Sequence, residues 1–196
     1  QDSSLAAGER WGSGIVLGYA GYCLAFLGLV FLALAMYIWR QGDAEFVFDT
    51  GSRTQLLLEK ETADEMVFSF SVPFRNRGSQ QGTLMDVFVR PWMPREQFSA
   101  AELTTQVTVA STPRNDGYWE ATLFPNEKLE NDVAVIQLKF RTNGGDIRQA
   151  MDQIVDLPLN IIYQVVARAE WYLSKTMLEL PMEEFHTAMQ KSRGQE

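Results

Sequence analysis

The apolar and polar positions divide the chain into two parts with different periods. Residues 11–39 read WGSGIVLGYAGYCLAFLGLVFLALAMYIW, with no charged side chain between Arg10 and Arg40. An α-helix needs about 20 apolar residues to cross a hydrocarbon core of ~30 Å, and this run is longer. The pattern predicts one transmembrane helix over residues 11–40, preceded by an N-terminal tail over residues 1–10.

The alternative interpretation of this run is a signal peptide that is removed. The apolar core of a signal peptide usually has ~7–15 residues and is followed by small residues at the cleavage site. Here the run is longer, and Tyr37, Trp39 and Arg40 make a poor cleavage site. We therefore expect a retained single-pass anchor, with Trp11 at one end and Trp39 at the other in the headgroup layers.

After residue 40 the apolar positions alternate with polar ones, as in strands with one buried face. The alternation is clearest in MVFSFSVPF (66–74), DVAVIQLKF (132–140) and IIYQVVARAEW (161–171). Weaker candidate strands cover residues 53–61, 83–90, 103–110, 117–124 and 175–180. Turn-forming stretches such as NRGSQQG and STPRNDG separate them. The pattern predicts a mainly antiparallel β-sandwich over residues 41–181.

Two segments of the second part depart from this alternation. Asp146 can cap the segment IRQAMDQIV, whose apolar residues have helical spacing: Ile147, Ala150, Met151 and Ile154. This segment predicts one short helix in the sandwich domain. Residues 182–196 are polar, and we expect them to form a frayed C-terminal tail.

The charge of the second part limits its partners. Setting aside Asp2, Glu9, Arg10 and Arg40 leaves 15 basic and 23 acidic side chains after residue 40, a net charge of −8. Nucleic acids and anionic membrane surfaces attract basic patches, so neither is expected as the main partner.

Catalytic and metal-binding residue types are scarce. The single cysteine, Cys23, lies in the apolar run, and the single histidine, His186, lies in the polar C-terminal segment. This excludes an intrachain disulfide and a zinc site of the Cys/His kind, and it leaves a hydrolytic triad without a credible base. The acidic stretches 59–65 and 127–132 lack the alternating spacing of a calcium loop. We expect no catalytic, cofactor or metal site.

Small residues recur along the apolar run in steps of four, three, four and three: Gly14, Gly18, Gly21, Ala25 and Gly28. Small residues let helix backbones approach closely in lipid, and this spacing keeps them on one seam. The spacing predicts a helix-packing face for other membrane protein subunits or for a second copy of the chain.

Two further sets of residues are candidates for specific contacts. Asp86 alternates with Leu84 and precedes Arg90 along the same predicted face, so we expect a structural Asp86–Arg90 pair on a partly buried face. In the stretch RPWMPREQF, three residues have the composition of a protein interface: Trp92, Met93 and Arg95. They are candidate partner contacts.

The stretch FRNRGSQQGTLMDVFVRP (74–91) resembles the strand–Asn-x-Gly turn–strand passage of immunoglobulin-like and late-embryogenesis-abundant type 2 domains. In those domains the Asn–Gly region turns the chain between two strands of a sheet. The resemblance implies a membrane-anchored immunoglobulin-like sandwich, and it implies no activity.

Two functions fit these features. The first is a non-enzymatic accessory or scaffold subunit of a membrane protein complex. The alternative is a membrane-tethered module that binds a lipid or another apolar ligand between its sheets, in a cavity lined by Phe70, Phe88 and Trp171.

The charges flanking the apolar run slightly favour a cytoplasmic domain. A short tail ahead of an anchor is a common layout for exported domains, and we expect the sandwich to be extracytoplasmic.

Overall fold

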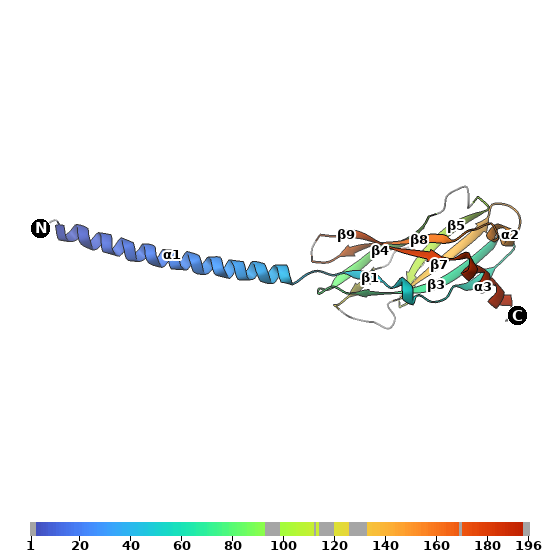
Figure 1. Ribbon diagram of the computed structural model, residues 1–196, viewed down its shortest axis with the longest axis horizontal. Coiled ribbons are helices and arrows are strands. Elements are labelled where there is room, and N and C mark those ends of the chain that lie inside the picture. The colour runs from blue at the N-terminus through green and yellow to red at the C-terminus, as the bar shows by residue number, and fades with distance from the viewer. Residues whose placement is uncertain are drawn as a thin grey trace. The chain divides into compact units, whose positions relative to one another are not determined.

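The computed structural model describes residues 3–92, 99–111, 113, 120–125, 133–168 and 170–193, with side chains from Gly18 onward. The chain forms two compact units, residues 1–42 and 43–196. The first unit contains helix α1 (Ser3–Arg40), and the second contains the strands and the remaining helices (Figure 1).

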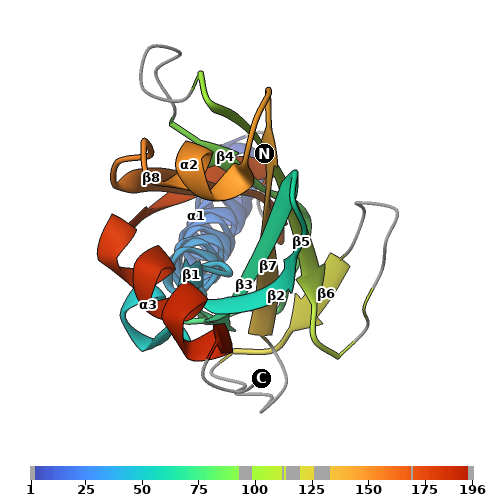
Figure 2. The same ribbon diagram turned by 90° about the vertical axis from the view of Figure 1, so that its right-hand side faces the viewer.

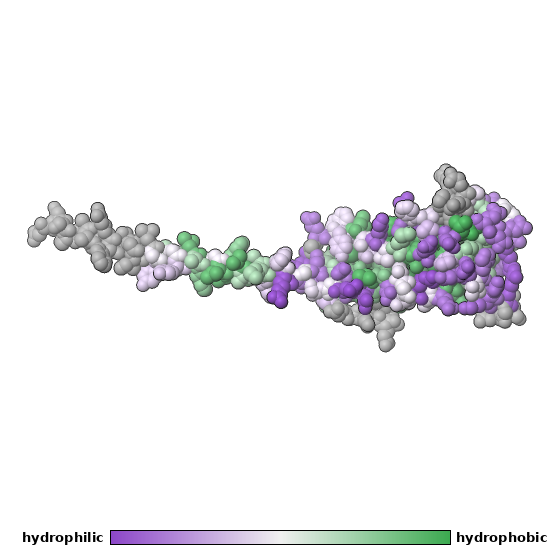
Figure 3. All heavy atoms as spheres, viewed as in Figure 1, coloured by the Kyte–Doolittle hydropathy of each residue, from purple (hydrophilic) through white to green (hydrophobic). Residues whose placement is uncertain are grey.

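Helix α1 has the length and composition of a membrane-spanning helix. An 18-residue window within its 23 residues from Gly18 to Arg40 has a mean hydropathy of 2.2. These residues extend over about 35 Å at 1.5 Å per residue, enough to cross a hydrocarbon core. All of their side chains are exposed, and apolar residues follow one another along this part of the helix (Figure 3). The helix begins at Ser3, so most of the segment predicted as an N-terminal tail is helical.

The second unit is a sandwich of two sheets in which every strand pairing is antiparallel. The first sheet has the order β1-β3-β7-β5 with β2 also paired to β3; its strands are β1 (Phe46–Phe48), β2 (Leu57–Glu61), β3 (Glu65–Asn76), β5 (Ala101–Val109) and β7 (Val133–Thr142). The second has the order β6-β4-β8-β9; its strands are β4 (Gly82–Pro91), β6 (Glu120–Leu123), β8 (Leu157–Val166) and β9 (Tyr172–Leu180) (Figures 1 and 2). The predicted fold class is confirmed.

The core is built from the alternating apolar positions of the long strands. In β3 the inward side chains are buried, as the sequence predicts, and so are those of its neighbour β7. The register places Phe68 opposite Leu138 and Phe70 opposite Ile136. The two sheets are also joined by a hydrogen bond of 3.1 Å from the Tyr163 hydroxyl to the Phe46 carbonyl.

The alternation in residues 161–171 led to one wrong prediction. Strand β8 ends at Val166, and β9 returns beside it with Val165 opposite Tyr172. The chain therefore reverses within the segment whose apolar residues continue the period of two. Trp171 lies on the surface, with 62% of its area exposed, instead of facing the core.

Helix α2 (Ile147–Met151) confirms the predicted short helix, and the Asp146 carboxylate accepts a hydrogen bond of 2.9 Å from the Arg148 N–H at its start.

The prediction of a frayed tail is wrong for residues 182–193, which form helix α3 (Met182–Arg193). The Phe185 ring of α3 is fully buried and packs edge-on at 5.1 Å from the Phe68 ring and 5.7 Å from the Phe140 ring. Burial of this ring and of Ala188, with Met182 and Met189 packed against the core, orders a segment whose composition is otherwise polar.

Asn76 joins three segments at one end of the sandwich. Its side chain is 1% exposed. Its Oδ1 accepts hydrogen bonds from the N–H groups of Glu45 at 3.1 Å and Gly78 at 2.9 Å. Its Nδ2 donates to the carbonyls of Gln80 at 2.7 Å and Leu123 at 3.2 Å. The asparagine of the Asn-x-Gly turn thus connects the start of the domain, the β3–β4 turn and the end of β6.

Replacing Asn76 by alanine is expected to lower the free energy of unfolding of the domain by about 3 kcal/mol, because buried donors and acceptors lose their partners. Urea denaturation of the detergent-solubilised protein measures this. Asn143→Ala is the matched control, since the exposed Asn143 side chain donates one hydrogen bond, to the Ser99 carbonyl, and should cost less than about 1 kcal/mol. Equal effects of the two substitutions would contradict the role assigned to Asn76.

Phe185→Ala is expected to destabilise the domain by about 3–5 kcal/mol, because it empties a closed site between two core rings. His186→Ala, on the exposed face of the same helix turn, should change stability by less than about 0.5 kcal/mol. A small effect of both substitutions would mean that α3 is not part of the core.

Candidate functional site

The small residues of α1 lie along one face of the helix. At 100° per residue, Gly18, Gly21, Ala25 and Gly28 fall within one narrow sector. Gly14 continues the spacing into the part of α1 for which the structure describes the backbone alone. A Cβ atom added at Gly18, Gly21 or Gly28 would meet none of the described atoms within 4 Å. Packing among the described residues therefore does not require glycine at these positions.

Two glycines of the sandwich domain, Gly78 and Gly82, differ in this respect. A Cβ atom at Gly78 would overlap the backbone of Asp43 and Ala44, and one at Gly82 would overlap the Ala44 side chain. These two glycines are explained by close approach of the chain within the folded domain. No such close approach among the described atoms accounts for the glycine face of α1.

A β-bulge in β4 changes the environment predicted for Asp86. The register runs from Met85 opposite Gln164 to Phe88 opposite Ile162, so β4 carries one extra residue here. Asp86 has a φ of 49°, in the left-handed region that aspartate enters more readily than most residues. Its side chain is exposed.

The bulge shifts the inward face of β4 by one residue. Leu84, Val87 and Val89 are buried, while Asp86 and Arg90 lie on the exposed side. The predicted partly buried face is therefore wrong. Within the described part of the chain no ion pair joins Asp86 to Arg90.

Trp92 follows the end of β4 and is 60% exposed. The backbone N–H of Trp92 donates a hydrogen bond of 2.9 Å to the Pro158 carbonyl. This bond fixes the backbone while the indole remains on the surface. The same sheet also exposes Phe88 and Met177. Met93 and Arg95 lie outside the described residues, and a partner contact at this site stays a prediction.

The residues proposed to line an internal ligand cavity do not come together. Phe70 is buried in the core, whereas Phe88 is 48% exposed and Trp171 lies on the surface of the β8–β9 turn. The bulge in β4 turns Phe88 outward, and the early end of β8 turns Trp171 outward. These three side chains give no support to a ligand site between the sheets.

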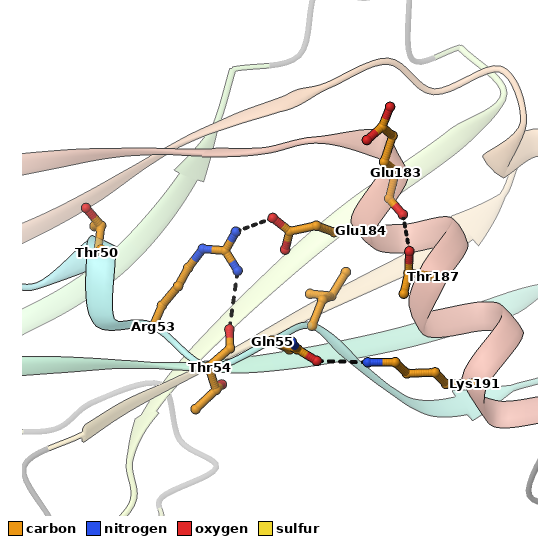
Figure 4. A pocket seen from close by; sticks show the side chains of 10 residues that line it. Thr50, Arg53, Thr54, Gln55, Glu183, Glu184, Thr187 and Lys191 are labelled. Atoms are coloured by element: carbon orange, nitrogen blue, oxygen red, sulfur yellow. Dashed lines mark hydrogen bonds and ion pairs between the residues drawn. The ribbon is translucent and has the colours of Figure 1, made fainter.

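A cleft of about 560 Å³ runs between residues 50–56 and α3 (Figure 4). The Arg53 guanidinium contacts the Glu184 carboxylate at 2.5 Å and donates to the Thr54 carbonyl at 3.2 Å. Lys191 Nζ donates to the Gln55 side-chain oxygen at 2.8 Å. Both cations of this cleft, Arg53 and Lys191, have partners within the chain, and these contacts attach α3 to the sandwich.

Shifted titrations occur at structural contacts away from this cleft. Hydrogen bonds from Lys139 at 2.7 Å and Lys60 at 3.2 Å hold the pKa of the Glu65 carboxyl below its usual value. Burial, with nearby Tyr163, raises the pKa of the Tyr172 hydroxyl. Among the described residues, no three His, Cys, Asp or Glu side chains are placed to hold a metal ion.

The chain matches no protein-family model and no curated protein sequence. Among solved structures, it is similar to the GAE domain of GGA2p from Saccharomyces cerevisiae, with a TM-score of 0.33 and 9% identity over 70% of this chain and 97% of that one. It is also similar to the GAE domain of yeast GGA1, with a TM-score of 0.32 and 9% identity over 65% of this chain and 99% of that one. Similarity at this level carries no functional inference. The comparisons give no support to the late-embryogenesis-abundant type 2 resemblance.

The attachment of α3 through Arg53 and Glu184 can be measured with a double-mutant cycle. Arg53→Ala and Glu184→Ala should show a coupling energy of about 1 kcal/mol in the free energy of unfolding, decreasing at high salt. The Lys60–Glu65 pair, whose lysine is more exposed, serves as the comparison and should couple more weakly. A coupling near zero for Arg53–Glu184 would contradict the attachment.

Proposed function

We propose that the chain is a non-enzymatic, membrane-anchored accessory or scaffold subunit of a membrane protein complex. Helix α1 crosses the bilayer once and packs laterally against other helices, from a different subunit or from a second copy. The sandwich lies on the extracytoplasmic side and contacts partners outside the bilayer.

The observation that carries this proposal is the open glycine face of α1. The helix is apolar, exposed throughout its described side chains, and lined on one face by residues that give it a flat surface. In lipid, helices associate through van der Waals contact and close backbone approach, because the hydrophobic effect does not distinguish a neighbouring helix from a lipid tail. A flat glycine seam is therefore suited to a helix partner.

Two features of the sandwich support the proposal: several of its charged groups are paired within the domain, and some of its large apolar side chains are exposed. Arg53 and Lys191 of the α3 cleft and the Glu65 carboxylate are engaged in contacts within the domain. The sandwich also exposes large apolar side chains, among them Trp92, Phe88 and Met177. Exposed aromatic and methionine side chains are typical of protein interfaces, which fits a partner contact better than catalysis.

Replacement of Gly18 or Gly21 by leucine is expected to weaken assembly about tenfold, which corresponds to the 1–2 kcal/mol typical of a helix contact in lipid. The measurement is the fraction of the chain found in a complex after mild detergent extraction. Unfolding of the sandwich domain should not change, since neither residue contacts it.

Ala20→Leu is the matched control, because it makes a similar change of size at the same depth on a different face of α1. A photo-crosslinking residue at position 21 should give a discrete adduct, whereas one at position 20 should not. If neither position crosslinks to a protein and the leucine variants assemble like the parent, the proposal is wrong.

A further inference from the structure

Large apolar side chains are exposed at one end of the sandwich, which we call the hairpin end. It comprises the β8–β9 turn (167–171), the β3–β4 turn (77–81) and residues 43–45. Trp171, Leu173 and Val166 are exposed around the β8–β9 turn, and Phe124 is exposed just after β6, whose last carbonyl binds Asn76. The opposite end of the domain carries α2 and α3 (Figure 1).

Two hydrogen bonds fix the β8–β9 turn to the first residues of the domain. The Arg168 N–H donates to the Asp43 carboxylate at 3.2 Å. The Tyr172 hydroxyl donates to the Ala44 carbonyl at 3.1 Å. Helix α1 ends at Arg40, three residues before Asp43. Covalent reach alone keeps Asp43 within about 11 Å of Arg40 in every arrangement of the two units.

The two ends of the sandwich differ in apolar exposure and not in the sign of their charge. The hairpin end exposes Arg77 and Arg168 in its turns, together with the carboxylates of Glu45 and Glu170. Hydrophilic side chains dominate the surface around α3 (Figure 3). The two arginines can meet lipid phosphates, but the exposed apolar side chains are what make the hairpin end suited to a phospholipid surface.

We propose that the hairpin end, with Trp171 as its main contact, lies in the headgroup layer of the bilayer that holds α1. The indole combines a large apolar area with one N–H donor, the combination that is enriched at membrane–water interfaces. This inference rests on the proposed anchoring of α1. The contact gives the domain a second attachment and turns the end with Trp92 away from the bilayer.

Trp171 and Trp92 form a matched pair for testing this. They are 62% and 60% exposed and lie at opposite ends of the sheet that contains β4, β8 and β9. The full chain is reconstituted in nanodiscs of phosphatidylcholine, part of it brominated near the headgroup end of its acyl chains. The readout is the fraction of tryptophan emission that the bromines quench in the parent protein and in Trp171→Phe, Trp92→Phe and Trp39→Phe.

Loss of Trp171 should lower the quenched fraction, because it removes an emitter close to the bromines. Loss of Trp92 should raise it, because it removes an emitter that the bromines do not reach. If Trp171→Phe raises the quenched fraction while Trp39→Phe lowers it, the anchor stands and the hairpin contact is refuted. If the parent emission is not quenched at all, both the anchoring and the hairpin contact are refuted. Unchanged thermal midpoints verify that the variants are folded.

Discussion

The buried amide of Asn76 is the contact on which the hairpin end of the domain depends. An asparagine side chain offers two donors and one acceptor oxygen, and all of them are used here. The amide replaces water for backbone groups of three segments that could not otherwise be buried together. By fixing Glu45 it also fixes Asp43 and Ala44, and these two hold the β8–β9 turn through Arg168 and Tyr172. The hydrogen bonds of Asn76 therefore help to fix both the start of the domain and the position of Trp171.

In the rest of the domain, some side chains stabilise the fold and others are exposed without a structural role. Period-two burial in β3 and β7 forms the core, and Phe185 of α3 closes it against Phe68. Arginine and lysine side chains beside α3 are paired within the chain. Among the described residues, three apolar surfaces have no role in folding: the glycine face of α1, Trp92 and the hairpin end. They are the surfaces on which the proposed contacts with lipid and other proteins rest.

Much of the fold was predictable because burial imposes a local period. The alternation of β3 and β7 and the Asp146 cap of α2 depend on neighbours in sequence, so the sequence predicts them. Helix α3 was missed although Met182, Phe185 and Ala188 have helical spacing, with acidic residues in the first turn and basic residues in the last. Acidic residues at the start and basic residues at the end stabilise a helix through its dipole, so this arrangement was a signal for a helix. The polar composition of the segment led instead to the prediction of a frayed tail.

The errors at Asp86 and Trp171 have a different origin. The bulge at Asp86 depends on how β4 pairs with β8, and the reversal after Val166 depends on how β9 returns along β8. Neither is marked by a glycine or a proline at the site, and the alternation of residues 161–171 continues through the reversal. A period of two fixes which residues share a face only while the pairing is regular, so these faces could not be assigned from the sequence.

The central claim is that α1 associates with other helices through its glycine face, and the composition of the intact membrane assembly tests it most directly. Native mass spectrometry of the full chain released from its own membrane into lipid nanodiscs measures that composition. The account predicts a defined stoichiometry of this chain with at least one further membrane-spanning chain, either a second copy or another subunit. A single copy surrounded by lipid alone would contradict it.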